Sequence, residues 1–309
     1  MIITKQIGTD NLAKVYIGQI EGRKFEFAES LQPPLQLNEK WVLIISCLYG
    51  CPVKCIMCDA GRRYDGCMSK EDIFSQIDYL IARRFPDKHV PVKKFKIQFT
   101  RMGEPAFNPA VLEVLEELPV RYTAPCLIPS ISTIGPKNCS GFFSRLREIK
   151  NKLYRNGKFQ MQFSVHSTDL EKRDKLIPVQ KMSFKDIADY GKEFYVQGDR
   201  KITLNFIVMK DYPINPKIIS TFFDKDIFLI KLTPLNPTKN AEKNKLETKL
   251  DPYDENSVAQ LTRSFRSLGF ETIVSIGELE ENKIGSNCGQ YISSDKNISS
   301  VTTTGVFNL

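Results

Sequence analysis

Three cysteines lie close together in the stretch "GCPVKCIMC", which ends at residue 58. Cys51, Cys55 and Cys58 follow the pattern C-x3-C-x2-C. Three thiolates on one short loop suit three irons of a [4Fe–4S] cluster and leave the fourth iron without a protein ligand. The alternative is a structural zinc site, which needs a fourth ligand. Cys47 is the nearest thiol that could supply it, although this spacing is not the usual one for zinc.

The composition is that of an ordinary globular protein. Of the 309 residues, 41% are hydrophobic and 26% are charged. No apolar run is long enough to span a membrane, and the N-terminal stretch "MIITKQIGTD" lacks the pattern of a secretory signal. We therefore expect a cytoplasmic protein without a membrane partner. In that reducing compartment, eight cysteines serve as ligands, catalytic thiols or packing residues rather than disulfides.

The net charge of +8 favours polyanionic partners. RNA is one candidate. Many soluble enzymes carry as much charge, however, and the chain has no array of alternating basic and aromatic residues typical of a committed RNA-binding protein.

From residue 41, strand and helix patterns alternate six times. The predicted strands are 41–46, 94–100, 126–133, 158–166, 201–209 and 227–235. The predicted helices between them are 69–85, 109–118, 139–154, 184–197 and 215–223. A further helix (253–268) and strand (271–277) follow. This alternation predicts an α/β fold with right-handed crossovers and a parallel sheet.

The strands are polar at every second position. Parallel strands that are buried on both faces are normally apolar throughout. The inward layer of a complete eight-stranded barrel is also apolar. A polar inner face therefore favours an open, partial (β/α)6 TIM-like barrel around a ligand cavity; a sheet with one wet face is the alternative. The polar positions are Lys96, Gln98, Gln160, Gln162, Ser164, His166, Thr203, Asn205, Lys231 and Thr233.

Several strands end in segments that could bind a ligand. These are "RMGEP" after the second strand, "SISTIGP" at the third, "SVHS" followed by "RDKLIP" at the fourth, and "PLNPT" at the sixth. The carboxyl ends of strands are where α/β barrels build their sites. A plain turn is the alternative for any one of them.

Together these segments resemble the RlmN/Cfr class of radical S-adenosylmethionine (SAM) RNA methyltransferases. That class carries a GC-x3-C-x2-C triplet, an MGEP loop, an ST-x-G turn, an S-x-H segment followed by RDKL, a late P-x-NP and a final CGQ. The resemblance covers about residues 40 to 292. It implies a radical SAM barrel over 41–292. The residues themselves predict a small N-terminal β extension (1–40), a hairpin or two short strands, and a polar tail (293–309).

The resemblance also implies cofactors and contacts. The [4Fe–4S] cluster would be held by Cys51, Cys55 and Cys58, and SAM would chelate its open iron. A reductant such as flavodoxin or ferredoxin would supply the electron. The residues expected to contact SAM are Gly103, Glu104, Ser132, Ser164, Val165, His166 and Asn236. For His166, the alternative to a SAM contact is an imidazole packed at a strand end.

Cys288 matches the cysteine that is itself methylated in this class. The implied chemistry begins with methylation of the Cys288 thiolate by one SAM. A radical generated from a second SAM then takes hydrogen from the new methyl group. The resulting carbon radical adds to an sp2 carbon of a nucleic acid or another heteroaromatic substrate. A buried packing cysteine is the alternative.

The chain departs from the class at two places, the position of Ile44 and the length of the N-terminal part, and a third feature matches the class only weakly. Ile44 replaces a second cysteine, which in the class releases the product by forming a disulfide with the methylated one. Cys47 and Cys67 are the substitutes that we consider. Glu26 resembles a glutamate proposed as a proton acceptor, although a surface glutamate on a strand is the simpler interpretation. Only 50 residues precede Cys51, so we expect no N-terminal RNA-binding domain, which argues against ribosomal RNA as substrate.

Three functions therefore remain open. The first is the methyltransferase that acts through Cys288. The second is a radical SAM enzyme that abstracts hydrogen and then rearranges or cross-links its substrate, without methyl transfer. The third is a non-catalytic iron–sulfur or zinc module.

Overall fold

The computed structural model describes residues 1–251, 253–276 and 291–292. Alternating strands and helices account for most of this part of the chain. The strands are β1 (Ile2–Gly8), β2 (Ala13–Ile20), β3 (Arg23–Ser30), β4 (Trp41–Ile45), β5 (Leu48–Gly50), β6 (Tyr64–Cys67), β7 (Phe95–Phe99), β8 (Leu127–Thr133), β9 (Gln160–Ser164), β10 (Ile202–Ile207), β11 (Phe228–Thr233) and β12 (Thr272–Val274). The six strands predicted after residue 40 are confirmed, with slightly shorter bounds.

The helices are α1 (Lys70–Arg84), α2 (Ala110–Arg121), α3 (Ser140–Leu153), α4 (Leu170–Leu176), α5 (Phe184–Phe194), α6 (Pro216–Phe222), α7 (Lys239–Lys243) and α8 (Ala259–Ser267). Every predicted helix is present. The Ser69 hydroxyl and the Asp72 carboxylate form the capping box that begins α1. The sequence patterns did not predict α4, α7 or the short hairpin of β5 and β6.

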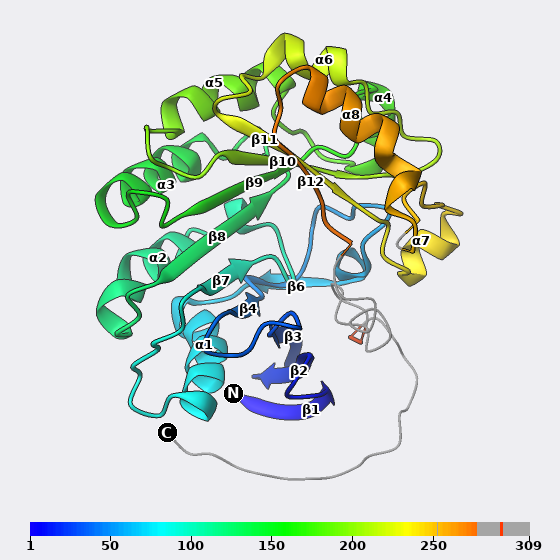
Figure 1. The fold of residues 1–309 in the computed structure, drawn as a ribbon. Coiled ribbons are helices and arrows are strands. Elements are labelled where there is room, and N and C mark those ends of the chain that lie inside the picture. The colour runs from blue at the N-terminus through cyan, green and yellow to red at the C-terminus, as the bar shows by residue number, and fades with distance from the viewer. Residues whose placement is uncertain (252, 277–290, 293–309) are drawn as a thin grey trace.

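One ten-stranded sheet organises the described residues, in the order β1-β2-β3-β4-β7-β8-β9-β10-β11-β12. The strands from β4 to β12 in this order pair in parallel. Because β1 and β12 end the order and do not pair with each other, the barrel is open. Figure 1 shows the sheet as an arc with the helices along its outer side. The predicted partial barrel is confirmed.

The N-terminal extension is larger than expected. It has three strands rather than a hairpin or two short strands, and β3 pairs antiparallel with β4, with Ala28 opposite Ile44. The extension therefore continues the barrel sheet at one edge (Figure 1).

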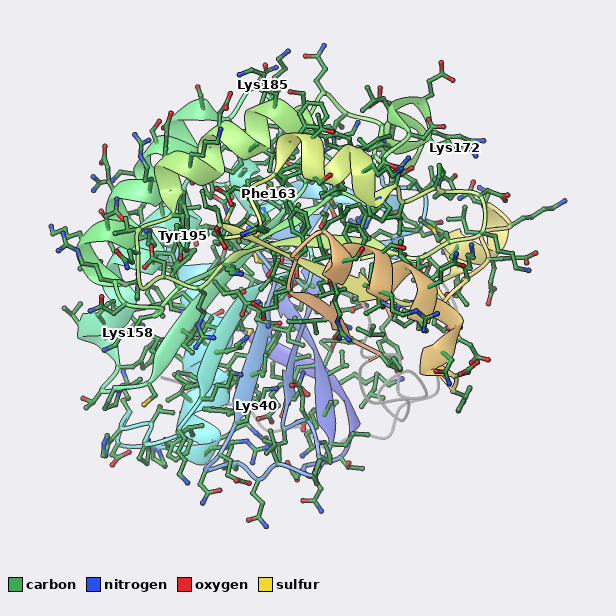
Figure 2. All side chains as sticks on the ribbon, turned by 45° about the horizontal axis from the view of Figure 1, so that its top comes forward. Lys40, Lys158, Phe163, Lys172, Lys185 and Tyr195 are labelled. Atoms are coloured by element: carbon green, nitrogen blue, oxygen red, sulfur yellow. The ribbon has the colours of Figure 1, made fainter. Side chains whose placement is uncertain are left out.

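The hydrophobic core lies between the sheet and the helices. The apolar side chains that alternate with the polar ones are buried there, as the strand pattern predicts. They include Phe95, Ile97, Phe99, Met161, Phe163, Leu204 and Phe206. At about 25 cal/mol per Å² of buried apolar surface, such rows of aromatic and branched residues provide the main stabilisation of the fold. Lys172 and Lys185, by contrast, extend outward from the helical layer (Figure 2).

Among the described helices, none combines the length and the apolar character that crossing a membrane would require.

Candidate functional site

The three clustered cysteines occupy a tight loop after β5. Gly50 begins it with φ +95°, and a Cβ at this position would lie 1.8 Å from the Arg63 carbonyl oxygen, so only glycine fits where the two arms of the hairpin meet. Inside the loop, the Cys58 N–H donates to the Cys55 carbonyl at 3.0 Å. Cys51, Cys55 and Cys58 are all partly exposed.

Backbone amides surround the Cys51 thiol. Burial raises the pKa of this thiol to about 12, whereas hydrogen bonds from the N–H groups of Val53, Lys54 and Glu104 act in the opposite direction. Burial likewise raises the pKa of Cys55. A bound metal centre neutralises such buried thiolates, and N–H groups directed at the sulfur are the partners that cluster-bound thiolates use. The donor set therefore fits an iron–sulfur cluster.

Helix α7 and the residue on either side of it hold the cysteine loop. Three side chains of this segment donate to three consecutive backbone carbonyls of the loop. The pairs are Asn244 Nδ2 to Ile56 O at 2.9 Å, Thr238 Oγ1 to Met57 O at 2.7 Å, and Asn240 Nδ2 to Cys58 O at 2.7 Å. We call residues 238–244 the clasp.

Asp59 completes the clasp from the loop side. This buried carboxylate accepts from the backbone N–H groups of Lys239 at 3.1 Å and Asn240 at 2.9 Å, at the start of α7. The sequence predictions did not include Asp59 or the clasp. The only available signal was Thr238, a residue type that favours the N-cap of a helix.

The two substitute thiols differ in accessibility. Cys47 is buried in the main core, and its thiol donates to the Met102 carbonyl at 3.6 Å. Burial raises its pKa well above the ordinary value. Cys67, on β6, is exposed. A packing role therefore suits Cys47, and Cys67 is the accessible one of the two thiols.

A cavity of about 460 Å³ opens inside the arc of the sheet. Residues from every parallel strand from β4 to β11 line it, so the predicted polar inner face does surround a ligand-sized space. It brings together two of the cluster cysteines and four of the residues expected to contact SAM. These lining residues are Cys55, Cys58, Ser132, Ser164, His166 and Asn236.

His166 is held in one protonation state. Burial, assisted by the charge of Arg173, lowers its pKa to about 3, so the ring is neutral at physiological pH. Its Nδ1 accepts from the Ile207 N–H at 3.2 Å, which leaves the proton on Nε2. His166 also has φ +64°, a backbone conformation unusual for a non-glycine residue and common at functional sites. It is a positioned hydrogen-bond donor at the cavity wall.

Glu104 lies behind the cavity wall rather than on it. Its carboxylate accepts from the N–H groups of Ala106 at 3.1 Å and Ile134 at 2.9 Å and from the Thr133 hydroxyl. Burial raises the pKa of Glu104 to about 7. Its neighbour Gly103 has φ +102°, which favours glycine.

Gly103 and Val165 are not brought to the cavity in the described part of the chain. A Cβ at Gly103 would lie 2.5 Å from Leu48, so the close approach here is to a core side chain. The Val165 side chain is fully buried, and its N–H donates to the Asn205 carbonyl at 2.9 Å.

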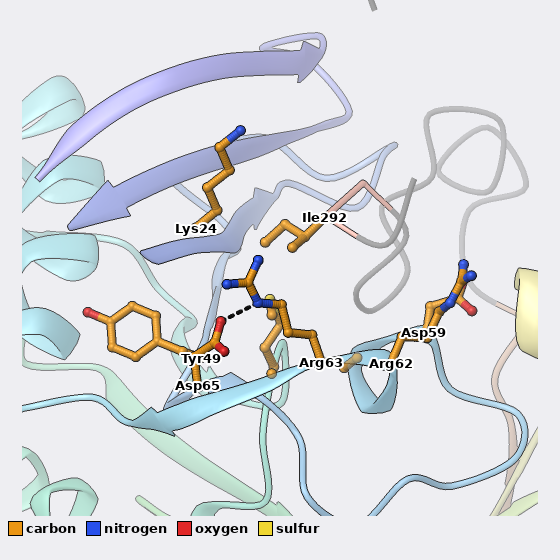
Figure 3. A pocket seen from close by; sticks show the side chains of 10 residues that line it. Lys24, Tyr49, Asp59, Arg62, Arg63, Asp65 and Ile292 are labelled. Atoms are coloured by element: carbon orange, nitrogen blue, oxygen red, sulfur yellow. Dashed lines mark ion pairs between the residues drawn. The ribbon is translucent and has the colours of Figure 1, made fainter. Parts of the chain in front are cut away.

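Glu26 is not a surface glutamate, so that interpretation is wrong. The side chain is completely buried, and Glu26 Oε2 pairs with Arg101 at 2.5 Å. Its other oxygen accepts from the N–H groups of Tyr291 at 2.7 Å and Ile292 at 2.9 Å. Figure 3 shows Ile292 near Lys24 and Arg63, where the N-terminal strands face the β5–β6 hairpin. Cys288 lies outside the described residues, three positions before Tyr291.

No protein-family model matches the chain. Among curated proteins, it is 25% identical over 262 residues to a probable dual-specificity RNA methyltransferase RlmN of Pseudothermotoga lettingae, which covers 82% of this chain and 71% of that protein. A second RlmN, from Petrotoga mobilis, is 21% identical, covering 92% of this chain and 79% of that protein. A third, from Helicobacter hepaticus, is 25% identical but is covered over only 47% of its length.

The fold is also found among solved structures. A radical SAM methyltransferase from Sphaerobacter thermophilus superposes with a TM-score of 0.72 at 18% identity, covering 94% of this chain and 81% of that one. Streptococcus suis SuiB bound to S-adenosylmethionine superposes with a TM-score of 0.51 at 15% identity, over 76% of this chain and 51% of that one.

The fold and the relatives together define a class of protein. The chain has the fold of the radical SAM enzymes and is itself an enzyme. Within that class it resembles the RlmN/Cfr methyltransferases. The predicted resemblance, fold class and enzyme class are confirmed.

Proposed function

We propose that this enzyme transfers a methyl-derived carbon from SAM to an sp2 carbon of a heteroaromatic substrate through Cys288. The cavity carries the proposal, because it joins two of the three clustered cysteines to four strand-end residues of the predicted SAM site. The named activity of the relatives, RNA methylation, supports the choice of methyl transfer within the radical SAM class.

In this proposal Cys51, Cys55 and Cys58 hold the [4Fe–4S] cluster. When bound, the cluster supplies the electron that cleaves SAM reductively. The protein's own residues orient SAM: Ser132 and Ser164 offer hydroxyls along one wall, and His166 offers a neutral Nε2–H donor. Asn236 lies two residues before Thr238, so the clasp that holds the cysteine loop also positions a predicted SAM contact.

Cys288 takes part in two bond-forming steps. Its thiolate first displaces the methyl group from the sulfonium of one SAM, giving a thioether and S-adenosylhomocysteine. The 5′-deoxyadenosyl radical formed from a second SAM would take a hydrogen atom from that methyl group, giving 5′-deoxyadenosine and a carbon radical that adds to the substrate. For release, the new substrate carbon would lose a proton, and a second thiol would form a disulfide with the Cys288 sulfur as the C–S bond to the transferred carbon breaks. The surplus electron would return to the cluster. Cys67 is the exposed candidate for the second thiol.

One observation favours the second function, radical chemistry without methyl transfer. Ile44 stands where the RlmN/Cfr class has its second cysteine, and its apolar side chain lines the cavity. Under this alternative, SAM is cleaved but its methyl group does not reach the protein or the product.

The cluster assignment is tested with the anaerobically reconstituted enzyme and a Cys55→Ser variant. We expect the wild type to hold close to four irons and four sulfides and to form 5′-deoxyadenosine from SAM under dithionite. We expect the Cys55→Ser variant to lose at least 100-fold of this activity, while Cys126→Ser, at an exposed cysteine outside the site, retains it. Zinc without sulfide in the wild type would contradict the proposal.

A further inference from the structure

Two lysines lie on β7 and β11 at positions that precede the strand ends carrying the predicted SAM site. Lys231, on β11, lines the cavity two residues before Thr233, which is roughly 7 Å along the strand. Lys96, near the start of β7, reaches across β8 and donates to Gln160 Oε1 at 2.5 Å. Gln160 also lines the cavity. We call Lys96, Gln160 and Lys231 the floor.

No carboxylate pairs with the lysines of the floor in the described part of the chain. The described lining of the cavity contains no Asp or Glu. Its other cation, Arg101, is paired with Glu26. None of the ion pairs found among the described residues involves Lys96 or Lys231.

The charges of the floor act on one another. Burial lowers the pKa of Lys96 to about 7, and the nearby cations Lys94, Lys40, Arg200 and Lys231 lower it further. Burial and the charge of Lys40 also lower the pKa of Lys231. Lys231 and Gln160, the acceptor of Lys96, both line the cavity, so the two lysines border a common space. An anion bound there would remove the cost of desolvating them.

A buried acceptor beside Lys231 independently indicates a ligand. Asn205 pairs in register with Lys231 and lines the same cavity. Its side chain is 8% exposed, and its Oδ1 has no hydrogen-bond partner. Buried polar atoms are almost always paired, so an unpaired acceptor on a cavity wall calls for a donor from a ligand.

We propose that the floor binds the oxyanion of the substrate, and that the substrate is therefore a small phosphorylated or carboxylated molecule that enters the barrel. Its anionic group binds Lys96 and Lys231, and an N–H or O–H group donates to Asn205 Oδ1. This inference rests on the proposed function only in taking the cavity as the place where the radical chemistry occurs.

The binding test needs no turnover. Orthophosphate, malonate, AMP and adenosine are titrated calorimetrically into the anaerobically reconstituted enzyme, with and without SAM. We expect phosphate or malonate to bind, and the stronger of the two identifies the oxyanion. With phosphate as that group, we expect AMP to bind at least tenfold more tightly than adenosine. We expect Lys231→Met and Lys96→Met to weaken binding of the preferred anion at least tenfold.

Matched variants separate the floor from general charge effects. Lys192→Met, at an exposed lysine of α5, should leave binding unchanged, and Lys231→Arg should restore most of it. Lys→Met removes a buried charge and keeps a long side chain, so the variants should fold and keep the cluster absorption.

Three outcomes would overturn the inference: absence of anion binding, equal binding in Lys231→Met, or competition between the anion and SAM. An RNA oligonucleotide that displaces phosphate would overturn the choice of a small substrate. Transfer of a deuterated methyl group from SAM to Cys288 tests the proposed function separately. If Cys288 is labelled but no anion binds, only the inference about the floor is overturned. If an anion binds but Cys288 is not labelled, only the proposal of methyl transfer is overturned.

Discussion

Glu26 and Arg101 form an ion pair whose two side chains are completely buried, with Arg101 NH2 2.5 Å from Glu26 Oε2. The same glutamate accepts from the N–H groups of Tyr291 and Ile292 through Oε1. Its backbone N–H contacts the Met102 sulfur at 3.3 Å. One carboxylate thus joins the N-terminal sheet, the segment that follows β7 and the chain just after Cys288. These contacts suit a positioning residue better than a proton acceptor.

Removing one partner of this pair should destabilise the protein strongly. Glu26→Ala or Arg101→Ala leaves a buried charge without its partner, which costs about 3–5 kcal/mol. We expect each variant to lower the anaerobic thermal midpoint by on the order of 10 °C.

The double variant distinguishes the pair from two independent contacts. Glu26→Met combined with Arg101→Met should destabilise less than the sum of the single changes, because no charge is left unpaired. Strictly additive losses would contradict the pairing.

His166 should stay neutral across the physiological range. Its pKa in the fold is about 3, below the ordinary 6.5, so protons bind the unfolded chain more readily as the pH falls through this window. Stability is therefore lost on acidification, by roughly 1 kcal/mol at pH 5.5 from this residue.

The chain has only two histidines, so histidine-selective NMR resolves this directly. We expect the His166 ring signal to keep its neutral position from pH 8 to pH 5, and His89→Gln, at an exposed site, provides the assignment. A His166 midpoint near pH 6 would contradict the burial.

The clasp should protect the cluster. Thr238→Val removes the hydroxyl that donates to the Met57 carbonyl, and an unsatisfied buried carbonyl costs about 1–3 kcal/mol. We expect iron release to a chelator to be roughly tenfold faster, as followed by loss of the cluster absorption. Lys243→Ala, at an exposed position of the same helix, is the control. Wild-type release rates in Thr238→Val would show that the clasp does not hold the loop.

The sequence predicted the parts of the site that depend on local pattern. Strand alternation predicted the polar cavity wall, and cysteine spacing predicted the loop that carries Cys51, Cys55 and Cys58. Strand-end motifs predicted Ser132, Ser164 and His166, which all line the cavity.

The remaining parts depend on contacts between distant segments. Asn240 and Cys58 are 182 positions apart, and Tyr291 and Glu26 are 265 apart. The spacing of residues within a strand or helix does not predict which distant residues will pair. Glutamate is rarely buried, and Glu26 is buried because distant partners, Arg101 and the N–H groups of Tyr291 and Ile292, satisfy its two oxygens.

The most direct test of the account follows the methyl group of SAM. The anaerobically reconstituted enzyme is incubated with SAM bearing a deuterated methyl group, and its peptides are analysed by mass spectrometry, with Cys288→Ala as the control. We predict a deuterated methyl on the peptide that contains Cys288 and none in the variant. An unlabelled peptide in an enzyme that still forms 5′-deoxyadenosine under reductant would contradict the account and leave a radical SAM enzyme without methyl transfer.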